Sequence, residues 1–494
     1  MAIVKTSKKA RYSCKACLQI AALICLLAWA AGPKTAEGQK TSPPNILLIN
    51  IDDLGWRDLG YMGSAYYETP HIDQLAAQGM IFTHAYAAAA NCAPSRAALF
   101  SGQWAPRTGV YTVGSSERGP AEHRKLIPVE NRPHIQPDVL TIAQVLKAHG
   151  YVTCQVGKWH ISKDPTDFGF DVNYGGAQYG HPPAGYFSPW KISTLKDGPK
   201  GTELTDRLTD LAIQFLETHR EAPFFMNFAT YAVHTPLQGK PELVARYKEK
   251  QGRYGQNNPT YAAMIETMDA NVGRLIDCLK RTGQLDHTFI VFTSDNGGVY
   301  GITHQWPLRA GKGTYYEGGI RVPMVVVWPG KVRPGTASDQ SVVNIDYFPT
   351  FLAVAGIAPP DGKVLDGRSF LPALQQQRLP ERPLFWDFPV YLQKYTTKSQ
   401  SRDLCFRTRP GASVHLGDWV LIQYYEDNHL ELYNLGTDPG ERKNLIHTFP
   451  QRGAALLDSL DQWRARVHAP VPTALNPAYK PGGCPVQTVL KWQT

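Results

Sequence analysis

Two pairs of polar residues, Asp52-Asp53 and Asp295-Asn296, each follow an almost continuous apolar run of the chain. Ligands of open α/β sheets bind beyond the carboxyl ends of the strands, so these four side chains are expected to meet at one sheet edge. Three carboxylates and an amide oxygen suit a hard divalent cation, Ca²⁺ or Mg²⁺. No His or Cys accompanies either pair, which argues against zinc. Either pair alone indicates a turn or a helix cap, whereas their coincidence predicts a metal site.

Cationic and imidazole side chains follow two further apolar runs. Lys158 and His160 come directly after one run, and His234 lies in a short loop after another. Such groups bind anions and move protons when they converge on a pocket. The competing interpretations are a surface lysine and two histidines satisfied within the core.

The segment from Asn91 to Gly102 contains a cysteine in a reactive setting. Small residues lead into Cys92, and the sequence from Ser95 onward is typical of a helix start, with Arg96 one turn beyond Cys92. This arrangement predicts a nucleophilic cysteine with a lowered pKa. A lone buried cysteine is the alternative.

The elements that must position these residues are also visible in the chain. Alternating helix signals include Thr69-Pro70, which begins a helix that Gly79 ends, and helical spacing of apolar residues from Met264 to Leu279. We therefore predict an α/β fold with a large, mostly parallel sheet sandwiched by helices. Five apolar runs have the continuous hydrophobicity of strands covered on both faces: Asn45 to Ile51, Tyr151 to Val156, Phe224 to Ala229, Thr288 to Thr293 and Val322 to Trp328.

After about Leu374 the sequence changes character. A Gln- and Pro/Arg-rich link precedes short strands such as Trp419 to Tyr425 and His429 to Tyr433, and a helix is expected near Arg452 to Val467. The predicted organisation is an α/β catalytic domain over residues 45–374 and a smaller C-terminal α+β domain, built on a short antiparallel sheet, over residues 375–494.

Composition excludes disorder and gives no sign of nucleic-acid binding. Hydrophobic residues make up 43% of the 494 residues and charged residues only 19%, so a sizeable core can form. The formal net charge is +9, and five of these charges lie in the first fifteen residues. The remaining bias is mild and fits small anionic ligands better than a polyanionic duplex.

The N-terminus has the pattern of a secretory signal peptide, predicted over residues 1–31. Basic residues precede an apolar run from Leu18 to Ala31, which is too short to span a bilayer. An uncleaved anchor is the alternative. Removal of this segment leaves five of the eight cysteines, and their pairing cannot be deduced from sequence.

The ordered motifs resemble those of the type I, formylglycine-dependent sulfatases of the alkaline phosphatase-like superfamily. Cys92-Ala93-Pro94-Ser95-Arg96, with Leu99 and Ser101-Gly102, is similar to the family hallmark, although Ser101 stands where Thr is commoner. Gly150 to His160 resembles the second family signature. Further elements fall in the family's order: Asp52-Asp53, His234-Thr235-Pro236, Asp295-Asn296-Gly297-Gly298 and Gly311-Lys312-Gly313.

The resemblance implies a mechanism. Cys92 would be converted to formylglycine by a formylglycine-generating enzyme. A divalent cation would be held by residue 92, Asp52, Asp53, Asp295 and Asn296. A hydroxyl of the hydrated aldehyde, bound to this cation, would attack the sulfur atom. Arg96, Lys158 and Lys312 would surround the sulfate oxygens. His234 or Lys312 would protonate the leaving alcohol, and His160 would act as the base that restores the aldehyde.

The resemblance and the leader together imply a secreted or periplasmic sulfatase that acts on a sulfated polysaccharide or oligosaccharide. His181, His304 and Arg309 are the predicted substrate-binding residues, and Gln178 is the alternative to His181. The rival hypotheses are a phosphate or phosphonate ester hydrolase of the same superfamily and a non-catalytic protein that binds sulfated glycans. No membrane span and no nucleic-acid partner are expected.

Overall fold

The computed structural model describes residues 1–3, 6, 43–394 and 400–484. The described residues from 43 onward belong to one compact unit. The predicted signal peptide over residues 1–31 lies outside the described residues, except for four near the start. Among the described helices, none has both the length and the apolar character needed to cross a membrane.

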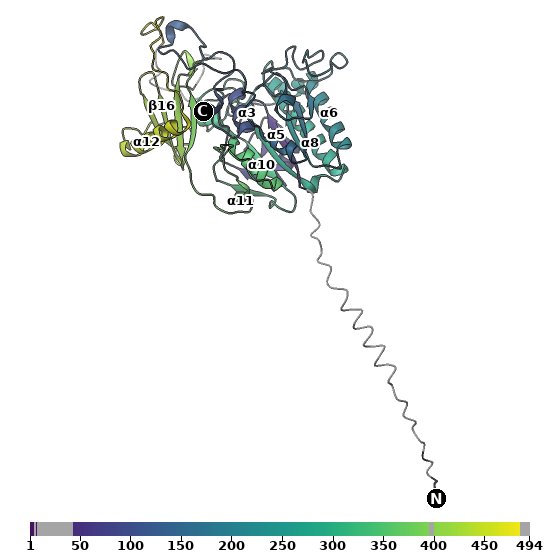
Figure 1. Cartoon of the computed structure of the whole chain (residues 1–494). Coiled ribbons are helices and arrows are strands. Elements are labelled where there is room, and N and C mark those ends of the chain that lie inside the picture. The colour runs from purple at the N-terminus through teal and green to yellow at the C-terminus, as the bar shows by residue number, and fades with distance from the viewer. Residues whose placement is uncertain (4–5, 7–42, 395–399, 485–494) are drawn as a thin grey trace. The chain divides into compact units, whose positions relative to one another are not determined.

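The central feature is an eight-stranded sheet (Figure 1). Neighbouring strands are parallel except where β9 pairs with β2 and β7, so the prediction of a mostly parallel sheet is confirmed. In spatial order the strands are β10 (Thr336–Ser338), β2 (Met80–Phe82), β9 (Met324–Val327), β7 (Thr288–Ser294), β1 (Asn45–Ile51), β6 (Phe224–Ala229), β4 (Val152–Gly157) and β5 (Val172–Tyr174).

The predicted strand from Val322 to Trp328 is divided in the structure. Pro323 lacks the N–H that a ladder needs, and it separates β8 (Arg321–Val322) from β9. β8 pairs with β3 (Ala85–Tyr86) in a small three-stranded sheet with β11 (Val342–Val343), while β9 joins the main sheet.

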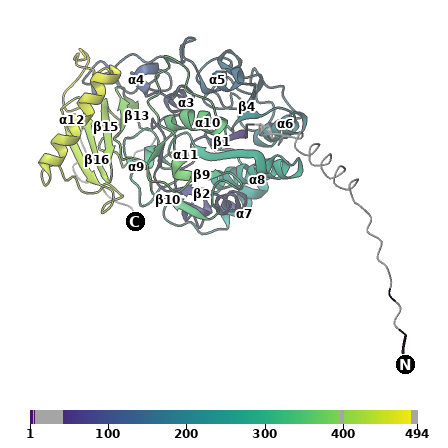
Figure 2. The ribbon, with the colours of Figure 1, turned by 60° about the horizontal axis from the view of Figure 1, so that its bottom comes forward.

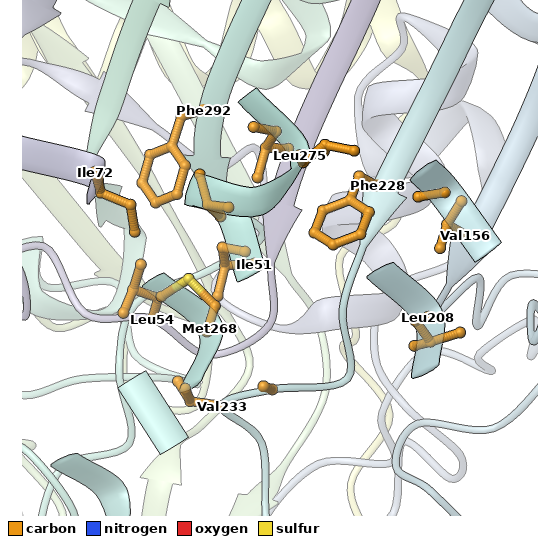
Figure 3. Close-up of a cluster of buried hydrophobic side chains, with 14 of the residues drawn as sticks. Ile51, Leu54, Ile72, Val156, Leu208, Phe228, Val233, Met268, Leu275 and Phe292 are labelled. Atoms are coloured by element: carbon orange, nitrogen blue, oxygen red, sulfur yellow. The ribbon is translucent and has the colours of Figure 1, made fainter. Parts of the chain in front are cut away.

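Side chains of β1 alternate between two cores, one on each face of the sheet. Leu47, Ile49 and Ile51 pack with one set of helices, and Ile46 and Leu48 with the other. Figure 3 shows part of the first core, where Met268 and Leu275 of a long helix lie beside Ile51 and Phe292. Burial on both faces explains why the strands are continuously apolar.

The first core is covered by α2 (Pro70–Ala77), α6 (Leu204–Thr218) and α8 (Pro259–Arg281), and the second by α3 (Cys92–Ser101), α5 (Ile142–Ala148) and α10 (Tyr347–Ala355). The predicted helices after Thr69 and through Met264 are therefore confirmed as α2 and α8. Four further α-helices precede the C-terminal part of the described chain: α4 (Ala105–Thr108), α7 (Pro241–Lys248), α9 (Glu317–Ile320) and α11 (Leu371–Leu374).

The C-terminal part contains a four-stranded antiparallel sheet, as predicted, with α12 (Pro450–Val467) packed across β15 and β16 (Figure 2). Its strands are β12 (Leu384–Phe388), β15 (Gly411–Leu416), β16 (Trp419–Tyr424) and β17 (Leu430–Asn434). Nearby, β13 (Leu392–Gln393) pairs with β14 (Phe406–Thr408). A disulfide joins Cys405 to Cys484, and the other cysteines of the described part of the chain, Cys92, Cys154 and Cys278, are free and buried.

Candidate active site

The two acidic pairs meet where β1 and β7 end. The strands run in parallel register up to Ile51 opposite Ser294, so Asp52 and Asp53 emerge beside Asp295. Carboxylate oxygens of Asp52, Asp53 and Asp295 all lie within 4.8 Å of one another, and each residue is almost fully buried. The convergence predicted from the strand ends is therefore present in the fold.

Each of these carboxylates is paired with a buried cation. Lys158 Nζ lies 2.6 Å from Asp52 Oδ2, and Arg96 Nε lies 2.9 Å from Asp295 Oδ2. Lys312 Nζ lies 2.6 Å from Asp53 Oδ1. We call these six residues, together with Asn296, the strand-end cluster. Three cations balance three carboxylates, so a bound divalent cation would leave the cluster with two excess positive charges, which suits an anionic substrate.

Cys92 begins α3 rather than preceding it. The helix starts three residues before the predicted Ser95, because Pro94 is tolerated in a first turn where its missing N–H would have had no partner. Cys92 is 2% exposed and Asn91 is the N-cap residue, with its side chain held by Thr112. Residue 92 thus lies at the positive end of the helix dipole, with Arg96 one turn further along.

Arg96 links α3 to the strand ends. Besides its ion pair with Asp295, it donates from Nη1 to the Lys158 carbonyl at 2.9 Å. Burial alone would lower the pKa of Arg96, but Asp295, Asp52 and Cys92 together raise it above the ordinary value. The guanidinium therefore stays charged between the cysteine and the acidic pairs.

The donor set fits a hard cation. Among the described residues, Asp52 Oδ1 and Asn296 Oδ1 are buried without a hydrogen-bond partner, although buried polar atoms are rarely left unpaired. Burial raises the pKa of Asp52, and Asp295 and Asp53 raise it further. A cation bound by these oxygens would relieve both the missing contacts and the crowding of like charge.

Asp53 is held in a strained backbone conformation that points its carboxylate into the cluster. Its φ is 59°, a left-handed value that non-glycine residues seldom adopt. The Asp295 carboxylate accepts from its N–H at 3.2 Å, and the Tyr261 hydroxyl donates to its carbonyl at 3.2 Å. Burial would raise the pKa of Asp53, but Lys312 and His234 hold it below the ordinary value.

The two predicted catalytic histidines border the cluster. His234 Nε2 lies 3.6 Å from Asp53 Oδ2, while its Nδ1 contacts the Thr235 carbonyl at 2.7 Å. Burial and the neighbouring Lys312 lower the pKa of His234 to about 3. His160 is 6% exposed, and burial together with Lys158 and Arg96 lowers its pKa as well. Both rings are therefore neutral in the described protein at pH 7.

The predicted substrate contact His181 lies near this group. Its side chain is exposed and its ring centroid is 6.2 Å from that of His234. Its contact with substrate stays a prediction. His304 is half-buried, packs on Tyr300 with ring centroids 4.5 Å apart, and lines a separate pocket.

Arg309 is placed differently from the expectation. It is 2% exposed and donates to the Gln400 carbonyl, the Tyr433 hydroxyl and the Glu441 carbonyl. Its guanidinium also lies 3.6 Å from the centroid of the Tyr316 ring. We correct its assignment from substrate binding to attachment of the C-terminal sheet, because its donors point inward. The surrounding buried charges, which we call the interface cluster, are Arg309, Arg321, Glu317, Glu431 and Glu441.

Sequence reasoning missed the residues that hold the metal-site loop. Asp58, fully buried, accepts hydrogen bonds from the Gly55 N–H and from the hydroxyls of Thr303 and Tyr261. It fixes the loop that follows Asp53 against α8 and the loop after β7. Its position five residues beyond Asp53 was the available signal, but a single acidic residue in a loop is equally typical of an ordinary turn or helix cap.

Two glycines of the matched motifs have a steric role. A Cβ at Gly297 would lie 2.0 Å from the Gly318 carbonyl oxygen, and one at Gly311 would lie 2.4 Å from that of Gly298. These close approaches bring Lys312, whose N–H donates to the Gly298 carbonyl, against the loop that carries Asn296.

Comparison with known proteins gives a consistent result over most of the chain. The family model described as Sulfatase matches residues 44–357, and that described as N-sulphoglucosamine sulphohydrolase, C-terminal, matches residues 309–463. A sulfatase of Formosa agariphila is 33% identical, with 86% of this chain and 90% of that protein covered. Human N-acetylgalactosamine-6-sulfatase is 32% identical, with 81% of each chain covered.

Among solved structures, that of Ps i-CgsB in complex with k-i-k-neocarrahexaose superposes with a TM-score of 0.70 at 30% identity. The match covers 85% of this chain and 93% of that one.

Proposed function

The chain belongs to the sulfatase family and is a sulfuric ester hydrolase, and we propose that its substrate is a sulfate ester of a carbohydrate. The support is twofold. The human relative is named N-acetylgalactosamine-6-sulfatase, and the solved Ps i-CgsB complex contains k-i-k-neocarrahexaose. The excess positive charge that a loaded strand-end cluster would have suits a sulfated ligand.

The proposal includes maturation of Cys92 to formylglycine by a formylglycine-generating enzyme. It also includes a divalent cation, Ca²⁺ or Mg²⁺, held by Asp52, Asp53, Asp295 and Asn296 together with residue 92. When both are present, the hydrated aldehyde supplies the attacking hydroxyl and the cation lowers the pKa of that hydroxyl.

The chain's own cations then bind and orient the sulfate group. Arg96, Lys158 and Lys312 approach the cluster from α3, from the end of β4 and from the loop after β7, so they can contact different sulfate oxygens. Because all three are at most 3% exposed, their interaction with a sulfate would be little screened by water.

Proton transfer requires a donor to the leaving alcohol and a base that regenerates the aldehyde. Lys312 Nζ lies beside Asp53, where it is positioned to protonate the leaving oxygen. His234 Nε2 lies there too, but in the neutral ring the hydrogen is on Nδ1, against the Thr235 carbonyl, so His234 would donate only after taking up a proton. His160 Nδ1 is buried without a hydrogen-bond partner among the described residues, which leaves it free to accept a proton. Gly180 packs directly against the His160 ring, since a Cβ there would lie 2.9 Å from it.

The observation that carries the proposal is the meeting of three carboxylates and three cations at one sheet edge, with residue 92 one helical turn from Arg96. The test is sulfate release from matched sulfate and phosphate esters by protein produced together with the maturation enzyme. We expect sulfate release from sulfated saccharides and a much slower reaction of the phosphate esters. A preference for phosphate or phosphonate esters would contradict the proposal, and so would binding without turnover by fully matured protein.

We also propose that the protein is exported to the periplasm or the medium. The support is the basic and apolar N-terminal pattern and the Cys405–Cys484 disulfide, a bond typical of oxidising compartments. Cell fractionation and N-terminal sequencing test this, with a mature N-terminus near residue 31 expected. Intact cytoplasmic protein would contradict it.

A further inference from the structure

A second pocket of about 390 Å³ lies in the loops beside the strand-end cluster. It belongs to none of the catalytic groups described above. Its lining includes Tyr254, Tyr300, His304, Trp306 and Arg442. Its lining combines aromatic rings with cationic and amide side chains, and these groups determine which ligand the pocket can bind.

Two of the aromatic rings form an exposed platform. Tyr254 and Trp306 stack with ring centroids 4.8 Å apart and an interplanar angle of 8°. They remain 39% and 36% exposed, which is unusual for large aromatic side chains. The Arg57 guanidinium lies 4.7 Å from the centroid of Tyr254 and 5.1 Å from that of Trp306, which stiffens the pair. The stack covers one face of each ring, and Arg253 lies 4.8 Å from the Tyr254 centroid, so the part of the pair that could pack on the apolar face of a sugar ring is its exposed remainder.

The charge of the pocket selects among sugars. None of its described lining residues is acidic, whereas Arg442 lies in the wall and Arg57 and Arg253 contact Tyr254. A pocket with cationic walls and no carboxylate in its described lining favours a ligand with a negative charge. The expected occupant is therefore a sugar unit with a sulfate or carboxylate substituent, rather than a neutral one.

The pocket is built on the loops that carry the catalytic residues. Arg57 is four residues beyond Asp53, and Tyr300 is four residues beyond Asn296. The Arg57 N–H donates to Gln305 at 2.7 Å, and the Arg57 guanidinium donates to the Trp306 carbonyl at 2.7 Å. The same two loops therefore position both the cation ligands and the aromatic platform.

We propose that the Tyr254–Trp306 pocket is a second saccharide subsite, which binds an anionic sugar adjacent to the one whose sulfate is hydrolysed. This inference rests on the proposed function and extends it, because it makes the substrate an oligosaccharide or polysaccharide rather than a sulfated monosaccharide. The second sugar would contribute binding that a single sulfated unit cannot, so affinity should rise with chain length.

The test measures binding by calorimetry in the Cys92→Ala background, in which turnover does not consume the ligand. The first series of probes is N-acetylgalactosamine 6-sulfate and a chondroitin 6-sulfate tetrasaccharide. The second series is a single sulfated sugar unit of iota-carrageenan and an iota-carrageenan tetrasaccharide. We expect at least one tetrasaccharide to bind about 10-fold or more tightly than its monosaccharide. Trp306→Ala and Tyr254→Ala should each remove most of that advantage, and Trp306→Phe should restore part of it.

Phe449→Ala is the matched control, because Phe449 is 44% exposed and lies outside the pocket. It should keep the full length dependence. Circular dichroism of each variant separates a lost subsite from a lost fold, and the Tyr254 and Trp306 variants test the platform from two different loops.

Equal affinity for monosaccharide and tetrasaccharide in both series would overturn the subsite, as would length dependence that survives both alanine variants. Sulfate release by matured wild-type protein is measured separately. Release together with length-independent binding rejects the subsite alone, whereas absence of release from every sulfate ester rejects the proposed function.

Discussion

The strand-end cluster and the interface cluster are both buried groups of three carboxylates with cationic partners, yet they are built differently. In the strand-end cluster each carboxylate faces a Lys or Arg, and oxygens of its three carboxylates lie within 4.8 Å of one another, an arrangement that the described carboxylates of the interface cluster lack. In the interface cluster, neutral donors are prominent. Glu431 accepts from the hydroxyls of Tyr316 and Tyr433, and Glu441 accepts from a backbone N–H.

Each cluster combines a carboxyl group whose pKa is raised with one whose pKa is lowered: Asp52 and Asp53 in the strand-end cluster, Glu441 and Glu431 in the interface cluster. Burial raises the pKa of Glu441, and the nearby Glu317 raises it further, so this pair holds a proton within the fold. Lys312 and His234 instead hold the pKa of Asp53 below its ordinary value despite its burial. Carboxylate oxygens that converge on one point indicate a site prepared for a cation, whereas carboxylates distributed among tyrosine hydroxyls and a backbone N–H indicate a structural junction. Buried charge alone does not identify an active site.

The largest contrast is expected from cysteine substitutions. Cys92→Ala should lower kcat at least about 1,000-fold, because it removes the proposed nucleophile, while destabilising the fold by only about 1 kcal/mol. Cys278→Ala, a buried free cysteine of α8, is the matched control and should keep wild-type turnover. Sulfate-release kinetics and thermal unfolding measure both effects. Comparable rates in the two variants would remove Cys92 from the mechanism.

The next largest difference between the two clusters is expected in their dependence on divalent cations. Chelation should abolish most of the activity, and Ca²⁺ or Mg²⁺ should restore it and raise Tm, because the ion binds only the folded state. Asp53→Asn should weaken the apparent cation affinity at least about 10-fold, as loss of a ligand does. Glu431→Gln, in the interface cluster, should leave that affinity unchanged. Titration of the cation against activity and Tm checks this, and full activity in metal-free protein would contradict it.

Arg309→Met should show the reverse pattern. Glu431 and Glu441 would lose a buried cationic neighbour, so the free energy of unfolding should fall by about 3 kcal/mol. The KM should stay close to that of the wild type, because the Arg309 donors contact the C-terminal part and not the strand-end cluster. Urea unfolding and saturation kinetics measure the two quantities. A raised KM with unchanged stability would return Arg309 to the substrate site.

The smallest effect concerns pH. The folded state retains a proton on Glu441 that the unfolded chain releases near the ordinary pKa of 4.5, so stability contributed by this group falls as pH rises above that value. Glu441→Gln removes the titration and should flatten the decline of Tm between pH 5 and 8. The variant should gain most, relative to wild type, at the upper end of that range. An unchanged or steeper slope would show that Glu441 is ionised in the native protein.

The strands and the strand-end cluster could be predicted because their signals are local. Continuous apolar runs marked β1, β6 and β7 almost to the residue, and acidic pairs directly after them located the site. The break between β8 and β9 results from the missing N–H of Pro323, and this proline was a signal that the sequence offered. The start of α3 at Cys92 required knowing that Pro94 fits a first turn.

Arg309 and Asp58 could not be assigned from sequence because their roles depend on distant partners. Arg309 lies three residues before Lys312, and only the fold shows that its guanidinium points toward Tyr433 and Glu441. Asp58 depends on Thr303 and Tyr261, which lie more than two hundred residues away. Side-chain direction across elements is a tertiary property, and no periodicity encodes it.

The most direct test of the proposed mechanism is mass spectrometry of the peptide that contains residue 92, taken from protein with full sulfatase activity. This peptide should have the mass of the aldehyde or of its hydrate, and activity should scale with the converted fraction. An unmodified thiol throughout fully active protein would contradict the proposed nucleophile.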